Sequence, residues 1–439
     1  MAAPGLTEAP ALRVRLGGHG PVPAGFLDAG EHADADVPLA PGDDLPFEDN
    51  AVAELEASAA ALGPTLATRF PRLVECRRVL APGGRFHLDV ATAASSAGDW
   101  REWTRLAGFV NDPAPGRALA LTKRDRSLAG TPLVSILIAS YNPRFFEAAL
   151  DSALTQTWEN LEIVICDDAR DDAIEAIVRR RPTRRAVRYE RNPERLRARA
   201  NYLHCVARAE GEFVKFLNDD DLLAPQCVER LLDAFRLAPD VTLATSARQV
   251  IDADGAMLPD WPATRPITAE SIVASGTSLA NAMLLHGLNF LGEPSTALFR
   301  RDDMLAMAQP FGFAGVEGRG VFDMVLWASL LAQGNGVYLT ERLSSLRAHA
   351  GQRQHQPDNQ ARTVDSVRAL QARWAELGLH RQTPPDLMLT RPFSPQGDAA
   401  WSLQPVASLT QVAADPERWC ERWRVACAAS EGLPVLAAQ

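Results

Sequence analysis

Residues 211–225 read GEFVKFLNDDDLLAP, a short apolar run that ends in three consecutive carboxylates. The apolar-rich residues Phe213–Leu217 are typical of a buried strand. The acids that follow, Asp219, Asp220 and Asp221, would repel one another unless a cation lay among them. Hard oxygen ligands at the tip of a strand suit Mg²⁺ or Mn²⁺, which also bind diphosphates. The pattern is also typical of a solvated acidic turn or of a helix N-terminus, where acids complement the helix dipole. This stretch alone leaves both interpretations open.

Two predicted strands upstream also end in polar residues. They are PLVSILIASYNP (residues 132–143) and LEIVICDD (residues 161–168). Apolar residues at helical spacing follow each of these strands and predict helices at 145–156 and 173–180. A short strand at 187–190 and a third helix at 198–209 come next, before the strand at 213–217, so strands and helices alternate along the chain. Strands that alternate with helices form an open parallel sheet, which binds ligands beyond the carboxyl ends of its strands. We therefore expect three polar clusters to meet in one site, namely Ser140–Asn142, Asp167–Asp168 and Asn218–Asp221.

Two stretches of this region carry a specific resemblance. VSILIASYNPRFFEAALDSALTQTWENLEIVICDDA and RARANYLHCVARAEGEFVKFLNDDDLLAP resemble the nucleotide-binding half of a family 2 inverting glycosyltransferase with the GT-A fold. The resemblance covers about residues 131–350. It implies an open, mostly parallel sheet with flanking helices. It also implies a metal-dependent enzyme that moves a sugar from a nucleoside diphosphate sugar to a hydroxyl acceptor.

The resemblance implies roles for individual residues of this site. Donor binding would fall to Ala139, Ser140, Tyr141, Asp168, Arg199, Asn201 and Asp219. Asp220, Asp221 and His349 would hold Mn²⁺ or Mg²⁺, with Asp220 as the principal ligand bridging the diphosphate. Two departures from the family pattern stand out. Asn218 occupies the place of the first acid of the Asp-x-Asp motif, and Asp167–Asp168 is followed by Ala169 and Arg170 instead of Gly-Ser.

A carboxylate downstream is the expected general base. Residues 322–331 (FDMVLWASLL) predict an apolar helix with one acid, Asp323, near its start. One interpretation is that this acid only complements the helix dipole. The resemblance implies an acid at this position, followed by Trp and Leu, that deprotonates the acceptor hydroxyl. Apolar neighbours would raise the pKa of such an acid toward neutrality. LSSLRAHAGQ (343–352) resembles the family's R-x-H closing segment, and the polar residues 353–355 predict a flap over the donor.

Residues 179–199 contain ten arginines. Arginine forks suit phosphate, so a diphosphate-binding role is one interpretation. A solvated basic face is the commoner outcome of such a charge run. Arg195, Arg197 and Arg199 are the candidates for a phosphate contact.

The N-terminal segments resemble a different family. RVLAPGGRFHLDV (78–90), preceded by an amphipathic helix, is similar to the RVLKPGG stretch of class I S-adenosylmethionine-dependent methyltransferases and implies a small Rossmann-like α/β domain. Three departures indicate a degenerate domain that does not methylate. His19 interrupts the glycine turn 17–20, only Asp28 lies near the expected ribose-binding acid, and residues 57–63 (ASAAALG) lack the expected polar motif.

We therefore expect three parts: the methyltransferase-like domain at 1–127, the glycosyltransferase domain at 131–350 and a helical C-terminal extension at 351–439. Helical spacing at 362–377 and a Trp-containing segment at 416–429 support the extension, and the Pro-rich residues 382–397 are expected to be irregular. The net charge of −10 argues against nucleic-acid binding. The six cysteines are scattered without CxxC pairs and predict reduced thiols in a cytoplasmic protein. The sequence has no apolar run long enough to predict a transmembrane helix. We therefore expect a cytoplasmic protein, and a peripheral position at the inner membrane is the alternative.

The leading functional hypothesis is sugar transfer to a saccharide, lipid-linked or protein acceptor, in the synthesis of a surface polysaccharide, lipopolysaccharide or glycoconjugate. One alternative is a bifunctional enzyme that also methylates. Another is a non-catalytic scaffold that binds nucleotide sugars. The joint presence of Asp220 and Asp323 favours the enzyme over the scaffold.

Overall fold

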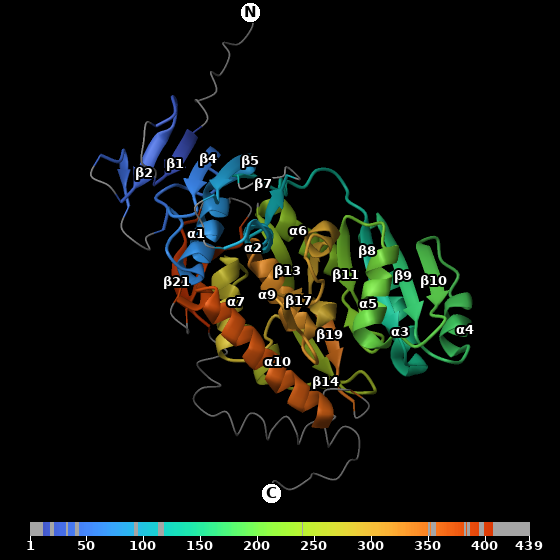
Figure 1. Cartoon of the computed structure of the whole chain (residues 1–439). Coiled ribbons are helices and arrows are strands. Elements are labelled where there is room, and N and C mark those ends of the chain that lie inside the picture. The colour runs from blue at the N-terminus through green and yellow to red at the C-terminus, as the bar shows by residue number, and fades with distance from the viewer. Residues whose placement is uncertain are drawn as a thin grey trace, which may run out of the picture. The chain divides into compact units, whose positions relative to one another are not determined.

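The computed structural model describes residues 12–17, 22–31, 34–39, 44–91, 95–112, 118–238, 240–349, 352, 357–381, 383, 387–394 and 399–406. The glycine turn beyond residue 17, the flap at 353–355 and the Trp-containing segment 416–429 lie outside these residues. The chain divides into two compact units (Figure 1). Met1–Arg126 and Trp374–Gln382 form the N-terminal unit, and Ser127–Arg373 and Thr383–Gln439 form the central unit.

The N-terminal unit is built on a seven-stranded sheet of order β3-β2-β1-β4-β5-β7-β6. The first five strands of this order are parallel to one another and β7 runs antiparallel to them. Strand β6 pairs antiparallel with β7 and therefore runs in the same direction as the first five. The elements are β1 Leu12–Leu16, β2 Leu27–Gly30, β3 Val37–Pro38, β4 Val52–Ser58, α1 Leu66–Val79, β5 Leu80–Asp89, α2 Ala97–Leu106, β6 Phe109–Asn111, β7 Ala118–Lys123 and the 3-10 helix η4 Leu379–Arg381. The small α/β domain expected at the N-terminus is thus present as a unit.

The two faces of this sheet differ in character. Val14, Leu55 and Phe86 point to one face and are fully buried. Arg15 and Glu56, one residue along their strands, point to the other face and are half-buried. Right-handed crossovers place α1, between β4 and β5, and α2, between β5 and β6, on the same face of the sheet. In the described ranges, therefore, helices cover one face and the charged face has no helix over it.

The Pro-Gly-Gly segment forms a bulge within β5. Leu80 pairs with Val52 and Arg85 pairs with Glu54, so residues 81–84 lie between two registers. Gly83 has a φ of +73°, a conformation that favours glycine. The turn predicted from the sequence is present, and it shifts the register of the strand without ending it.

Residues 374–382 complete the core of the N-terminal unit. Trp374, Leu377 and Leu379 are buried, and η4 contacts α1. Gly378 has a φ of +77°, and a Cβ added there would lie 2.0 Å from the carbonyl oxygen of Ala67. Only glycine fits this close approach.

The central unit is built on a twelve-stranded sheet whose main path is β10-β9-β8-β11-β16-β13-β19-β15-β20-β21, with β12 and β14 attached to β19 and β13. Its strands are β8 Val134–Ser140, β9 Leu161–Asp167, β10 Ala186–Arg191, β11 Phe213–Phe216, β12 Leu222–Leu223, β13 Val241–Ile251, β14 Met257–Leu258, β15 Ile272–Ala274, β16 Leu298–Arg300, β19 Asn335–Arg347, β20 Leu387–Pro392 and β21 Ser402–Pro405; β17 Gly312–Phe313 and β18 Val316–Glu317 pair separately. Its helices are α3 Pro143–Leu154, α4 Ala173–Arg179, α5 Arg197–Arg208, α6 Cys227–Leu237, α7 Gly276–Leu285, α8 Arg301–Leu305, α9 Phe322–Leu331 and α10 Pro357–Glu376, with 3-10 turns η1 Pro262–Thr264 and η2 Pro294–Thr296.

Strands β10, β9, β8 and β11 are parallel, as the alternating pattern predicts. The chain runs outward from β8 to β9 and β10 and then returns to β11 on the other side of β8. The helices on the outward path, α3 and α4, therefore lie on one face, and α5 lies on the other (Figure 1). This reversal of direction opens a crevice at the carboxyl ends of β8 and β11, where α/β sheets bind ligands.

Two expectations for this unit need correction. The sheet is mixed: its first four strands and the pair β13–β19 are parallel, but β16, β15, β20 and β21 each join an antiparallel neighbour. The C-terminal extension is helical in α10, but residues 387–392, expected to be irregular, form a strand. Side chains in β20 alternate between buried and half-exposed, and its backbone pairs with β15. Backbone pairing with a distant strand therefore outweighs the local proline signal. None of the helices in the described ranges has the length and apolar character needed to cross a membrane.

Candidate active site

Asp219 lies in the crevice between β8 and β11. Its Oδ2 accepts hydrogen bonds from the backbone N–H of Tyr141 at 2.6 Å and of Asn142 at 2.8 Å. These bonds fasten the loop after β11 to the loop after β8. Burial, and then the neighbouring carboxylate of Asp220, raise the pKa of Asp219 to about 7. Asp219 thus ties two of the expected polar clusters together.

Asp221 points into the protein. Its Oδ2 accepts hydrogen bonds from Ser295 Oγ at 2.6 Å and Asn218 Nδ2 at 2.8 Å, and its Oδ1 accepts one from the backbone N–H of Arg347 at 3.0 Å. The residue is fully buried, and burial raises the pKa of its carboxyl well above the ordinary value. Asn218 also faces inward, because its Oδ1 accepts a hydrogen bond from the buried Tyr202 hydroxyl. Both side chains therefore support the acidic loop from below.

Asp220 is the acid of this motif that faces His349. Its Oδ2 lies 3.0 Å from His349 Nε2, and its side chain is 20% exposed. The ring of Phe145 packs against the imidazole with 4.9 Å between centroids. Arg347 fixes the backbone of the loop, because its Nε donates to the carbonyl oxygen of Asp220 at 2.9 Å.

The donor set of Asp220 and His349 can accommodate a divalent cation. A carboxylate and an imidazole side by side are suitable ligands, and Mg²⁺ in proteins commonly takes one or two carboxylates with phosphate and water oxygens. Within the described residues, no group of three or more His, Cys, Asp or Glu side chains is placed to hold a metal ion. A cation here would thus need oxygen atoms from a bound diphosphate or from water.

Asp168 acts as a cap for helix α5. Its carboxylate accepts hydrogen bonds from the backbone N–H of Leu196 at 2.7 Å and of Arg197 at 2.8 Å, and from Asn192 Nδ2 at 3.1 Å. The N-cap residue itself, Leu196, makes no side-chain cap. An anion at a helix N-terminus satisfies unpaired N–H groups and complements the dipole. Arg197 has a φ of +66°, a strained conformation that these bonds hold in place.

Asn201 links β8 to β9 from beneath the crevice. Its Nδ2 donates to the carbonyl oxygens of Cys166 at 2.9 Å and Ser140 at 3.3 Å, and its Oδ1 accepts from Asn192 at 2.8 Å. Asn201 and Ser140 are both buried. Both residues therefore lie at the predicted place. The Asn201 side chain holds the strand ends together, whereas Ser140 takes part through its backbone carbonyl, and its buried Oγ has no hydrogen-bond partner among the described residues.

Tyr141 is the exposed aromatic residue at the rim. It is 45% exposed, and the guanidinium carbon of Arg195 lies 4.2 Å from the centroid of its ring. Such a pair offers a planar surface with a positive charge beside it. The neighbouring Ala139 is half-buried at the end of β8.

Most of the arginines at 179–199 are engaged with acids or with backbone. Arg181 pairs with Asp151 at 2.7 Å and Arg191 with Asp172 at 2.8 Å. Arg199, which was expected to face the nucleotide, donates from Nη2 to the carbonyl oxygen of Pro310 at 3.2 Å. The charge run is therefore largely a paired surface, and Arg195 is the member beside Tyr141.

Asp323 is the second residue of helix α9. Its Oδ1 accepts a hydrogen bond from the backbone N–H of Met324 at 2.8 Å, and its Oδ2 accepts one from Asn289 Nδ2 at 3.0 Å. Burial raises the pKa of this carboxyl to about 6, with a further contribution from the negative charge of Glu293. The side chain is thus fixed in orientation and half-buried.

Arg248, on β13, is a functional candidate near Asp323 that the sequence did not single out. Arg248, which is 3% exposed, donates to the carbonyl oxygens of Asn289 at 3.0 Å and Phe290 at 3.1 Å. Its Nε lies 3.0 Å from Glu293 Oε2. Arg248 therefore shapes the loop that presents Asn289 to Asp323. The signal for it in the sequence is a single cation in an otherwise uncharged strand, VTLATSARQVI.

The same loop continues to Ser295, which supports the acidic motif. Ser295 Oγ donates to Asp221 and accepts from the backbone N–H of Asn218 at 3.0 Å. The buried Lys215 donates from Nζ to the carbonyl oxygen of Ser295, and burial lowers the pKa of its ammonium group. One loop, residues 289–295, thus connects the acidic motif with the candidate base.

Comparisons with known proteins bear on this unit. Residues 135–303 match the family model described as "Glycosyl transferase family 2". An uncharacterized protein of Mycobacterium tuberculosis (strain CDC 1551 / Oshkosh) is 29% identical over 49% of this chain and 67% of its own length. Chondroitin synthase of Escherichia coli is 29% identical over 36% of this chain, which spans 22% of that protein. A mannosyltransferase of Pyrobaculum calidifontis, solved with GDP-Man and Mn²⁺, is 18% identical, with a TM-score of 0.39 over 75% of this chain and 86% of its own.

Proposed function

We propose that this chain, whose residues 135–303 form a glycosyltransferase family 2 domain, transfers a sugar from a nucleoside diphosphate sugar to a hydroxyl acceptor with inversion at the anomeric carbon. The observation that carries the proposal is the loop 289–295. It supports the acidic motif through the bond from Ser295 to Asp221, and the candidate base through the bond from Asn289 to Asp323. The loop 289–295 thereby supports both the acidic motif, where the leaving diphosphate would lie, and Asp323, the candidate base.

The donor would lie across the carboxyl ends of β8 and β11. Tyr141 and Arg195 offer a surface for the base of the nucleotide. Asp220 and His349 would hold a divalent cation, Mn²⁺ or Mg²⁺, together with oxygen atoms of the diphosphate. When bound, the cation neutralises charge that develops on the leaving diphosphate. Asp219, Asp221, Asp168 and Asn201 act in this proposal by keeping the loops in register.

Asp323 would act as the base. Its carboxylate takes the proton of an acceptor hydroxyl while the hydroxyl oxygen forms a bond to the anomeric carbon. The bond from that carbon to the diphosphate oxygen breaks on the opposite face, which inverts the configuration. A pKa of about 6 leaves Asp323 mostly ionised at neutral pH and still basic enough to accept a proton.

The acceptor is proposed to be a saccharide in polysaccharide synthesis. The similarity to chondroitin synthase supports this substrate class. Lipid-linked and protein-linked sugars belong to the same proposal, because Asp323 requires only a hydroxyl group. A cytoplasmic location, with or without attachment at the inner membrane, remains a prediction from the sequence.

The proposal is tested by screening nucleoside diphosphate sugars for thermal stabilisation of the full chain, with and without Mn²⁺. A donor that binds the folded state should raise Tm, and a concentration 100 times Kd corresponds to about 2.7 kcal/mol. Asp220→Ala should abolish the increment that depends on Mn²⁺, whereas Asp302→Ala, at an exposed acid on α8, should preserve it. Donor binding without any hydrolysis or transfer would contradict the enzyme and favour the scaffold.

A further inference from the structure

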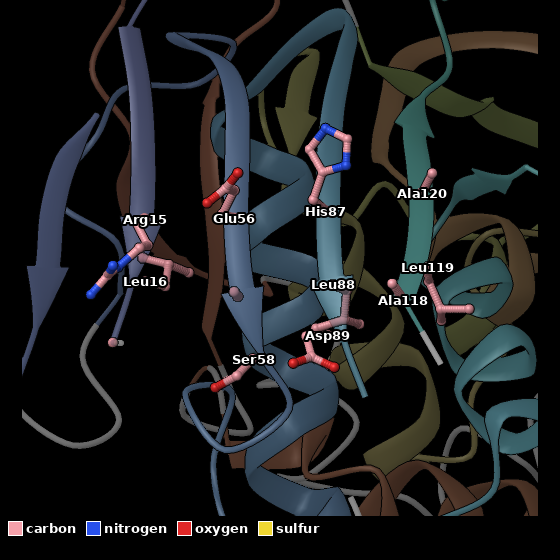
Figure 2. Close-up of a pocket in the computed structure, with 12 residues that line it drawn as sticks. Arg15, Leu16, Glu56, Ser58, His87, Leu88, Asp89, Ala118, Leu119 and Ala120 are labelled. Carbon is pink, nitrogen blue, oxygen red and sulfur yellow. The ribbon is translucent and has the colours of Figure 1, made fainter. Parts of the chain in front are cut away.

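The N-terminal unit contains a cavity of about 350 Å³ on the charged face of its sheet. The cavity lies at the carboxyl ends of β1, β4 and β5, and its polar lining comprises Arg15, Glu56, Ser58, His87 and Asp89 (Figure 2). Its volume falls in the range of about 300–1,000 Å³ that is usual for ligand pockets. No residue expected to act in the glycosyltransferase site belongs to it.

Register explains why this face is hollow. Arg15, Glu56, His87 and Ala120 lie directly opposite one another on four neighbouring strands. Two residues further toward the ends of β4 and β5, Ser58 pairs with Asp89, and Asp89 pairs with Ala118. Strand β7 therefore contributes two methyl groups beside longer polar side chains, and the difference in length leaves space for a ligand.

The cavity lies where an open sheet is expected to bind. Strand β1 has β2 on one side and β4 on the other, so the chain changes direction there as it does at β8. Ligands of open α/β sheets occupy the crevice beyond the carboxyl ends at such a point. The position alone therefore favours a binding role over an ordinary surface depression.

The polar groups in the cavity are only partly engaged. Glu56 is half-buried, and its side chain forms no hydrogen bond or ion pair with any residue in the described part of the chain. Asp89 Oδ1 accepts a bond from the backbone N–H of Ala91 at 2.8 Å, and Ser58 Oγ accepts one from that of Ala61 at 3.3 Å. His87 Nε2 lies 3.2 Å from Glu54 Oε1, outside the cavity. The lining thus combines an unengaged carboxylate with groups whose orientation is already set.

The chemistry of this lining selects among ligand classes. Glu56 and Asp89 repel an anion such as a free phosphate. Arg15 and the absence of a metal-binding cluster among the described residues disfavour a cation. A hydroxyl group both donates to a carboxylate and accepts from a guanidinium or an imidazole, so one kind of neutral group can pair with each of the polar side chains Arg15, Glu56, His87 and Asp89. Several hydroxyl groups on one molecule could form hydrogen bonds with several of these neighbouring side chains at once.

We propose that this cavity binds a saccharide through its hydroxyl groups, with Glu56 as the central acceptor. Resting on the proposed function, this saccharide is the glycan acceptor or product of the transferase, held by the N-terminal unit while its end is extended. The N-terminal unit then acts as a carbohydrate-binding module without chemistry of its own.

The test uses saturation-transfer NMR on the full chain with a panel of neutral oligosaccharides, without donor. At least one should bind. Glu56→Gln, which keeps the shape but removes the charged acceptor, should weaken binding about tenfold. Ala120→Leu, which fills the space beside His87, should abolish it. Glu102→Gln, at an exposed acid on α2, should have no effect.

A panel without any binder, or binding that survives both Glu56→Gln and Ala120→Leu, overturns the proposal. S-adenosylmethionine that binds in place of sugars, and is lost in Ala120→Leu, overturns the ligand class. Thermal melts show whether each variant is folded. The measurement uses no donor and does not depend on catalysis. Failure of the proposed transfer reaction would therefore leave this result unchanged.

Discussion

The two units of this chain carry polar residues at the same topological place, where the chain changes direction across an open sheet. In the central unit these residues are fixed by buried hydrogen bonds, as Asp221 is by Ser295, Asn218 and Arg347. In the N-terminal unit, Glu56 is half-buried and unengaged among the described residues. Burial raises the pKa of Asp219 and of Asp323 in the central unit. The difference indicates that position creates a crevice, whereas fixed and desolvated charges make it suitable for catalysis.

The largest expected effect falls on the candidate base. Asp323→Asn should lower kcat by about 10²–10⁴, the usual contribution of a general base, because the amide cannot accept the acceptor's proton. Donor binding, measured by thermal shift, should persist. Asp302→Asn is the control, since that acid is exposed on α8. A variant at Asp323 that keeps full turnover would remove the catalytic distinction between the two crevices.

A pair of serines measures how differently the two crevices are built. Ser295→Ala should lower the free energy of unfolding by about 1–3 kcal/mol, because it removes a partner from the buried Asp221 and from the N–H of Asn218. Ser58→Ala should change it by less than about 0.5 kcal/mol, since its hydroxyl is half-buried and accepts one long bond. Chemical denaturation of both variants checks the prediction. Equal losses would show that both sites are equally rigid.

The smallest effect is a shift in pH dependence. Asp323 must be ionised to act as a base, so kcat should fall as pH drops below about 6, where its carboxylate becomes protonated. Glu293→Gln removes a negative charge that raises this pKa, so the acid limb should move to lower pH. Glu270→Gln, at an exposed acid, serves as the matched control. If the acid limb of the kcat–pH profile instead moved to higher pH in Glu293→Gln, a group other than Asp323 would control it.

Local signals in the sequence were sufficient for the first half of the central sheet. The apolar runs that end at Ser140, Asp167 and Leu217 predict the parallel strands β8, β9 and β11, and the chain order predicts that their polar ends meet. The glycosyltransferase family resemblance is confirmed for residues 135–303.

What the sequence could not provide are contacts between distant residues. Asp221 depends on Ser295, 74 residues later, and on Arg347, 126 residues later. Asp168 lies at a strand end, as the expected donor contact would, but the start of α5 occupies its carboxylate. Strand β20 forms because its backbone pairs with β15, and the prolines around it in the sequence predict irregular structure instead. In each case a tertiary partner decides the role of a residue that looks ambiguous alone.

The return of the chain to the N-terminal unit at residues 374–382 has a consequence for biogenesis. The first 126 residues leave the ribosome long before Trp374 and Leu379, which complete their core, have been synthesised. Chain synthesis proceeds at about 5–20 residues per second, so this core waits on the order of ten to fifty seconds for its last segment. During that interval residues 127–373 of the central unit are already available to fold. A gene fragment that ends after residue 126 would therefore encode an N-terminal unit that lacks part of its core.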